Sequence, residues 1–309
     1  MFRFLLSVVI LFASLSASAD VEHHLLRRIA VFPIGEANLS NAEDAWWQMR
    51  EVLTKDQRFF VASRRFMVNR GVFQPRETLK PADAIILGKI LDAQALVTSY
   101  IDERTMRMRV YDGENGYVLW EGNAELHPAI PINDQVIRVA TQLMNQFVAA
   151  IPYQGFQVTD DVIGKPIWEE NNQQFAMVFV GPRSEVAVGD QVQWVKVTGN
   201  VSQPFFSSTT RVEVVAEGTV KDIKNDRATV RIDRMRDPAD LKNDALVRFP
   251  KEMNRLKELF ANEDKSSNLS SEYLSSEMKG SKEFSKDHSS TVTALMWIGS
   301  MAGFILLAF

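Results

Sequence analysis

Few residues in this sequence have the type and spacing that catalysis or metal binding requires. No two of its histidines stand at metal-ligand spacing on one predicted element, so the sequence predicts no metal site. Adjacent acids point to opposite sides of a strand and therefore make no general acid and base pair. The histidines are His23, His24, His127 and His288, and the acid pairs are Asp160 with Asp161 and Glu169 with Glu170.

Established catalytic motifs are also missing from the sequence. It contains no cysteine, which excludes thiolate catalysis, cysteine metal sites and a lipid-bearing cysteine. It contains no Gly-x-Ser-x-Gly elbow, no Walker loop and no dinucleotide fingerprint. We therefore expect a protein that is not an enzyme and has no cofactor, with an envelope hydrolase as the less favoured alternative.

The most basic and aromatic stretch of the chain is a candidate for partner binding. Arg64, Arg65 and Arg70 are interleaved with phenylalanines, and this combination can hold lipid headgroups or an acidic protein. An ordinary solvated connection between two elements is the competing interpretation. Trp46 and Trp47 are adjacent, so on a helix they cannot both face one core line. One of them is either a partner contact or buried under a neighbouring loop.

The stretch from Thr291 to Phe309 carries no charged residue. About 19 residues of helix span about 28 Å, close to the thickness of a bilayer core. We therefore expect a transmembrane helix over 291–309. Within it, Gly299 and Gly303 form a Gly-x-x-x-Gly pair, which favours close helix packing in a homodimer or homo-oligomer. The competing interpretation is that glycine is simply common in membrane helices.

Residues 1–19 have the layout of a secretory signal peptide. Arg3 precedes an apolar run, and small residues ending at Ala19 predict cleavage before Asp20. Export followed by a terminal anchor predicts a protein of the bacterial inner membrane whose folded domains lie in the periplasm. The lipid bilayer is then a partner of the terminal helix.

Residues 263–290 are rich in serine and in nearly balanced charge, which predicts a flexible linker between the folded domains and the anchor. An alternative is that small residues near Gly280 begin a glycolipid-anchor signal, from which the last helix is removed. The formal net charge of −4 and the pI near 5.7 do not indicate a nucleic-acid partner.

Residues 20–152 predict an α/β domain with a mixed sheet and three helices. Ser40 and Glu43 have the spacing of a capping box, which marks the start of a helix with one apolar stripe. The segment 58–66 is expected to return as a strand. Apolar and polar residues alternate along 105–111, as in an antiparallel strand with one solvated face. The three helices are expected near 40–53, 81–92 and 133–150.

Residues 153–250 predict a small all-β domain. Roughly five or six short strands separated by turn residues are compatible with an SH3-like barrel, and a sandwich is the open alternative. Residues 251–262 then predict a short amphipathic helix. The clearest strands are expected at 175–180, 191–197, 210–215, 218–223 and 228–232.

Several short segments of the first domain occur in a recognisable order. They are Ile29-Ala30-Val31-Phe32-Pro33, Arg58-Phe59-Phe60-Val61, Ala82-Asp83-Ala84-Ile85-Ile86-Leu87-Gly88, Met108-Arg109-Val110-Tyr111-Asp112 and Gly116-Tyr117-Val118-Leu119-Trp120. In this order the domain resembles the periplasmic α/β domain of the TolB amino-terminal region, the curli secretion protein CsgG, the activator LpoB and the middle of the flagellar protein FlgT. The β-rich segment, with Gly189-Asp190 and Gly218-Thr219-Val220, resembles the SH3-like domain that follows in the flagellar protein.

This resemblance implies a non-enzymatic envelope protein that binds other envelope proteins as a membrane-anchored scaffold or an assembly accessory. The alternative is a structural ring or stator-type oligomer of a secretion or motility apparatus. The family has no common catalytic residues. A pore of the CsgG type is not expected, because long amphipathic membrane strands are not evident in the sequence. We expect the uncharged terminal helix to take the place of the lipid anchor that several members carry.

Overall fold

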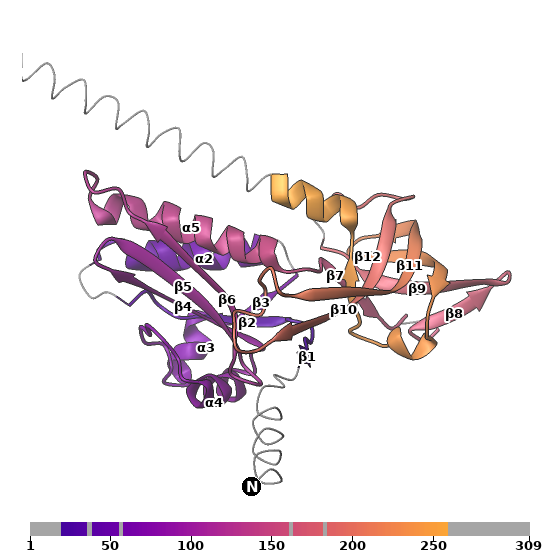
Figure 1. Cartoon of the computed structure of the whole chain (residues 1–309), viewed down its shortest axis with the longest axis horizontal. Helices are drawn as coiled ribbons and strands as arrows, with labels where there is room; N and C mark the ends of the chain where they lie inside the picture. The colour runs from indigo at the N-terminus through magenta and orange to yellow at the C-terminus, as the bar shows by residue number, and fades with distance from the viewer. Residues whose placement is uncertain (1–19, 36–38, 56–57, 161–162, 182–183, 259–309) are drawn as a thin grey trace, which may run out of the picture. The chain divides into compact units, whose positions relative to one another are not determined.

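The computed structural model describes residues 20–35, 39–55, 58–160, 163–181 and 184–258 (Figure 1). All of them belong to one compact unit, which ends at Phe260. The predicted signal peptide, linker and anchor, with Gly299 and Gly303, lie outside the described residues. Within the described part of the chain, no helix combines the length and the apolar character that crossing a membrane requires.

The first part of the chain forms a five-stranded mixed sheet with the strand order β3-β2-β4-β5-β6. Strand β2 pairs in parallel with β3 and β4, whereas β4, β5 and β6 form antiparallel pairs. Helices connect the parallel strands because such strands need crossover connections. The strands are β2 (Arg28–Val31), β3 (Phe60–Val61), β4 (Ala95–Asp102), β5 (Thr105–Asp112) and β6 (Val118–Glu125).

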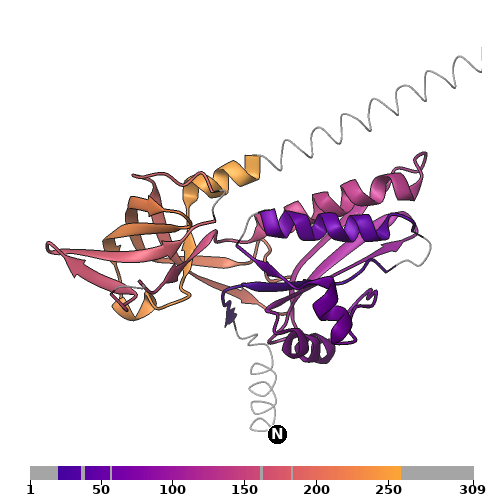
Figure 2. The same cartoon turned by 180° about the vertical axis from the view of Figure 1, so that it is seen from behind.

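Helices cover both faces of this sheet (Figures 1 and 2). Helices α2 (Ala42–Lys55) and α5 (Ile132–Ala150) pack on one face, and α3 (Arg64–Asn69) and α4 (Pro81–Leu91) lie on the other. The alternation predicted for 105–111 is present in β5. Its apolar residues are fully buried under α2 and α5, and its arginines are partly exposed.

The strand expected over 58–66 is wrong beyond its first residues. Only Phe60–Val61 is extended, and helix α3 begins at Arg64. The Ser63 hydroxyl accepts a hydrogen bond from the amide of Phe66 at 3.2 Å, so it caps a helix that a strand prediction misses. The predicted capping box is also wrong, because Glu43 pairs with Arg64 and the Ser40 hydroxyl donates to the Asn41 side chain.

The second part of the chain is a closed six-stranded barrel, which decides between the barrel and the sandwich. Its strand order is β10-β11-β12-β9-β7-β13, and pairing of β13 with β10 closes the ring. Short strands β1 (Asp20–Glu22) and β8 (Ile167–Glu170) add to β10 and β9. The barrel strands are β7 (Gly155–Val158), β9 (Gln173–Phe179), β10 (Gln191–Asn200), β11 (Arg211–Lys224), β12 (Arg227–Met235) and β13 (Leu246–Arg248).

The two strands expected at 210–215 and 218–223 are one long strand, β11, which bends at bulges opposite β12. Gly218 allows the close pairing there, since a Cβ at this position would lie 2.5 Å from the carbonyl oxygen of Arg231. A 3-10 turn (Pro238–Asp240) leads towards β13. A helix over 250–258 follows, and the rest of the predicted helix 251–262 lies outside the described residues.

The loop between β10 and β11 contacts the edge of the five-stranded sheet. The amide of Phe205 donates to the carbonyl of Val118 at 2.9 Å, and the amide of Phe206 donates to that of Leu119 at 2.6 Å. Both phenylalanine rings also pack against the buried His23 ring. These contacts join the barrel to strand β6 through hydrogen bonds and apolar packing.

Candidate functional site

Helix α2 places the two adjacent tryptophans in different environments. Trp46 is only 1% exposed, and its indole Nε1 donates to the carbonyl of Val31 on β2 at 2.8 Å. Trp47 is 47% exposed. Because neighbouring residues of a helix point about 100° apart, one indole can join the core while the other reaches the surface. The two rings meet edge to face at 4.9 Å.

Arg50 completes an aromatic and cationic group that sequence reasoning missed. Its guanidinium carbon lies 4.9 Å from the ring centre of Trp46 and 5.0 Å from that of Trp47. The signal was present in the helical spacing, since residues three and four apart are neighbours on a helix. A cation over aromatic faces is favourable, so the two rings hold this guanidinium in place.

The charge of Arg50 is not neutralised within the described part of the chain. No carboxylate there forms an ion pair with it, and its Nε atom is buried without a hydrogen-bond partner. Partial burial lowers the pKa of Arg50 from its usual value, because removal of water disfavours the charged form.

A hollow of about 330 Å³ lies beside this group. Trp46, Phe73 and Leu39 form apolar parts of its wall, and Arg64 and Glu43 are at its rim. The Phe73 ring meets the Trp46 ring edge to face at 5.1 Å. The Arg64 guanidinium lies 5.4 Å from the centre of the Phe73 ring and pairs with Glu43 at 2.5 Å. Helices α2 and α3 therefore both contribute to one surface.

The sequence-predicted contact residues are only partly brought together. Trp46 and Arg64 share the hollow, and Trp47 adjoins it through Trp46 and Arg50. Arg65 and Arg70 are exposed on α3 and at its C-terminal cap. The Arg70 guanidinium lies 5.3 Å from the centre of the Phe66 ring. We call Trp46, Trp47, Arg50, Arg64 and Phe73 the α2–α3 surface.

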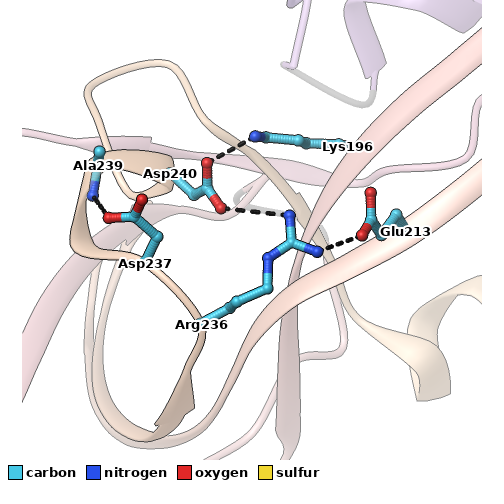
Figure 3. Close-up of polar contacts among 6 residues, drawn as sticks. All are labelled: Lys196, Glu213, Arg236, Asp237, Ala239 and Asp240. Carbon is cyan, nitrogen blue, oxygen red and sulfur yellow. Dashed lines mark hydrogen bonds and ion pairs between the residues drawn. The ribbon is translucent and has the colours of Figure 1, made fainter.

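Charged groups of the barrel are, in contrast, paired with one another (Figure 3). Lys196 donates to Asp240 at 2.6 Å, and Arg236 pairs with both Asp240 and Glu213. The hydrogen bond from Lys196 lowers the pKa of Asp240, and the same bond raises the pKa of Lys196. The Asp237 carboxylate caps the following turn by accepting from the Ala239 amide at 2.9 Å.

A second hollow, of about 390 Å³, lies next to this network. Its lining mixes acidic and basic side chains, among them Glu22, Lys196, Asp240 and Lys242. Lys196 and Asp240 already satisfy each other, so neither is available to a ligand without giving up this ion pair. Among the described residues, no cluster of three or more histidine, aspartate or glutamate side chains has the geometry to hold a metal ion.

Comparison with known proteins gives no family assignment. No protein-family model matches the chain. No curated protein matches it either.

Partial structural likenesses are found among solved bacterial proteins. Lipoprotein GNA1162 from Neisseria meningitidis is 16% identical, over 40% of this chain and 98% of that chain, with a TM-score of 0.27. The LpoB C-terminal domain from Escherichia coli is 17% identical, over 38% of this chain and 93% of that chain, with a TM-score of 0.27. TolB from Acinetobacter baumannii is 12% identical, over 68% of this chain and 59% of that chain, with a TM-score of 0.28. These values are too low to assign an activity, a partner or a location to this chain.

Proposed function

We propose that this chain is a membrane-held envelope protein that acts by binding other proteins and catalyses no reaction. The α2–α3 surface is the proposed contact site. The observation that carries the proposal is the position of Arg50, which is held between Trp46 and Trp47 without a carboxylate partner among the described residues. A protein that uses this group needs no catalytic residue, only a complementary partner.

The composition of the surface supports binding of a protein. Tryptophan and arginine are enriched among the residues that dominate the energy of protein interfaces. Trp47 presents about half of its surface to solvent, and its ring orients the Arg50 guanidinium before any partner arrives. Because the Arg50 side chain is already ordered and partly desolvated, binding of a partner costs less free energy than it would if this side chain had to be immobilised first. Charge-assisted hydrogen bonds to a carboxylate then stabilise the complex.

The proposed location and domain organisation rest on the sequence. Residues 1–19 fit a secretory signal, and the uncharged stretch 291–309 fits a membrane helix. We also propose that the α/β part and the barrel are separate domains that meet after residue 152. With this organisation the α2–α3 surface belongs to the first domain and faces periplasmic partners.

Site-specific photo-crosslinking in cells tests the proposal. A photoreactive amino acid at Asp44, which is exposed in the first turn of α2, reports on the α2–α3 surface. The same amino acid at Ile86 is the control, because Ile86 is exposed on α4, a helix that contributes no residue to the α2–α3 surface. The proposal predicts a discrete protein adduct from position 44 that is lost in the Arg50→Gln chain and is absent from position 86. Equal adducts from both positions, or none from position 44, would contradict it.

A further inference from the structure

We infer that the occupant of the α2–α3 surface is an extended acidic protein segment whose one apolar side chain enters the hollow beside Trp46. This inference rests on the proposed function and names the chemistry of the partner. It follows from the charge of the surface, the size and lining of the hollow, and the position of two arginines around it.

The charge of this region is opposite to that of the whole chain. Residues 58–76 contain five arginines and no acidic residue, whereas the chain has a formal net charge of −4. The arginines are Arg58, Arg64, Arg65, Arg70 and Arg76, of which Arg58 is buried and donates to the carbonyl of Tyr153, so the exposed cations are Arg64, Arg65 and Arg70. Arg50 of α2 adds a further cation, which lies over the ring of Trp46, a residue that lines the hollow together with Arg64. Such a local excess of positive charge attracts an acidic segment and opposes a basic one.

The hollow has the size for a side chain and not for a folded domain. Its volume of about 330 Å³ lies at the lower end of the range, about 300–1,000 Å³, in which pockets bind small ligands. Trp46, Phe73 and Leu39 give it an apolar lining. An aromatic or branched aliphatic side chain would bury apolar surface there and contact the indole and phenyl rings.

Arg64 lines the hollow and Arg50 lies over its wall residue Trp46, and the two arginines differ in whether they have a carboxylate partner. Arg50 has no carboxylate partner among the described residues, so it is available to an acidic side chain that flanks the anchor. Arg64 already pairs with Glu43 at 2.5 Å, and both side chains are about half exposed. A carboxylate of the partner therefore competes with Glu43 for Arg64. Removing the charge of Glu43 should strengthen binding.

An anionic lipid surface fits these observations less well than a peptide. Lipid headgroups are bound through clusters of about four to eight basic side chains that reach a flat surface together. Here the guanidinium groups of Arg50, Arg64 and Arg70 lie over aromatic rings, and the apolar lining forms a hollow. This arrangement matches a short segment with alternating acidic and apolar groups.

The test uses the full chain in detergent micelles and an array of synthetic acidic dodecapeptides. Each peptide carries a single leucine, isoleucine, phenylalanine or tryptophan anchor at a different position. Each has two matched partners, one with asparagine and glutamine in place of the acids and one with glycine in place of the anchor. Fluorescence anisotropy measures the affinity, and thermal melting confirms that every variant is folded.

We expect a subset of the acidic anchored peptides to bind at least about tenfold more tightly than both matched partners. Arg50→Gln should weaken that binding by at least about tenfold, and Glu43→Gln should tighten it by about threefold. The control Arg234→Gln removes an exposed barrel arginine and should leave the affinity unchanged.

Three results would overturn the inference. One is that the amide peptides bind as tightly as the acidic peptides. Another is that Arg50→Gln leaves folded protein with unchanged affinity. The third is Arg50-dependent binding of phosphatidylglycerol vesicles with no binding of any peptide, which would identify a lipid surface as the occupant. If no peptide binds but the position 44 adduct persists, the inference about the segment is wrong and the proposed protein-binding function stands.

Discussion

The guanidinium carbon of Arg50 lies 5.0 Å from the ring centre of Trp47, and the two residues are three positions apart on one helix. This pair turns an exposed indole and a partly buried cation into a single preformed group. The helix sets the spacing of these side chains. The Arg50 guanidinium also lies over the buried Trp46 ring, which contributes to its partial burial.

Replacing Arg50 should change binding much more than stability. Stacking of a partly exposed cation on aromatic rings contributes about 0.5–1 kcal/mol, and removing an Nε atom without a hydrogen-bond partner offsets part of that loss. We therefore expect Arg50→Gln to lower the free energy of unfolding by less than about 1 kcal/mol. Urea denaturation monitored by tryptophan fluorescence gives this value. A loss above about 3 kcal/mol would show that Arg50 is mainly a packing residue.

His23 should make the protein less stable in mild acid. Burial, with a smaller effect of the neighbouring His24, lowers the pKa of His23 from 6.5 to about 3. The unfolded chain therefore binds a proton as the pH falls through about 6.5, while the folded chain does not until about pH 3. Stability thus decreases as the pH falls across this window, by about 2 kcal/mol at pH 5.

Thermal melting at pH 7.5 and pH 5.0 measures the effect of His23. The His23→Phe chain, which keeps an aromatic ring beside Phe205 and Phe206, should lose most of the difference between the two melting temperatures. His127→Gln, at a partly exposed loop histidine, should retain it. The same pH dependence in the wild-type and His23→Phe chains would assign the effect to other groups.

Gly88 should not tolerate a side chain. A Cβ at Gly88 would clash with the backbone of Gly113, where helix α4 approaches the turn after β5. Although alanine is the better helix former, we expect Gly88→Ala to cost about 1–3 kcal/mol through overpacking. Ile86→Ala on the exposed side of the same helix should change stability by about 0.5 kcal/mol or less. Denaturant titrations of the two variants compare them, and equal stabilities would exclude a close backbone approach.

Gln157 should be essential for the barrel. Its side chain is fully buried, accepts from the Trp194 indole at 2.9 Å and donates to the carbonyls of Pro166 and Leu241 at 2.8 and 3.2 Å. Gln157→Leu leaves these three groups without their partner, so we expect a loss of at least about 2 kcal/mol. Exposed Gln174→Leu on β9 is the control. Calorimetric melting that shows no difference between the two variants would refute this role.

The sequence predicts those helices and strands that are long and whose apolar residues recur at a regular spacing. The alternation of β5 and the apolar stripe of α5 are visible in the sequence, because each extends over several periods. Helix α3 has only six residues, too few for a period to be recognised. The barrel was one of two expectations, since closure depends on the three-residue strand β13 pairing with β10 far away in the chain.

The candidate site could be predicted only in outline. The adjacent tryptophans and the arginine-rich stretch stand out by composition, but their meeting depends on the contact of Phe73 with Trp46 and on the ion pair of Arg64 with Glu43. Sequence reasoning missed Arg50 because a single arginine in an amphipathic helix belongs to no motif that indicates binding. Its importance follows from the two rings around it and from the carboxylate that it lacks among the described residues.

The most direct test of the central claim is the affinity of the purified partner captured from position 44. Isothermal titration should compare the wild-type chain with Arg50→Gln and with the matched barrel variant Arg234→Gln. Binding through the α2–α3 surface predicts that the Kd rises at least about tenfold for Arg50→Gln and stays within about twofold for Arg234→Gln. Equal Kd values for the wild-type and Arg50→Gln chains would contradict the assignment of this surface as the binding site.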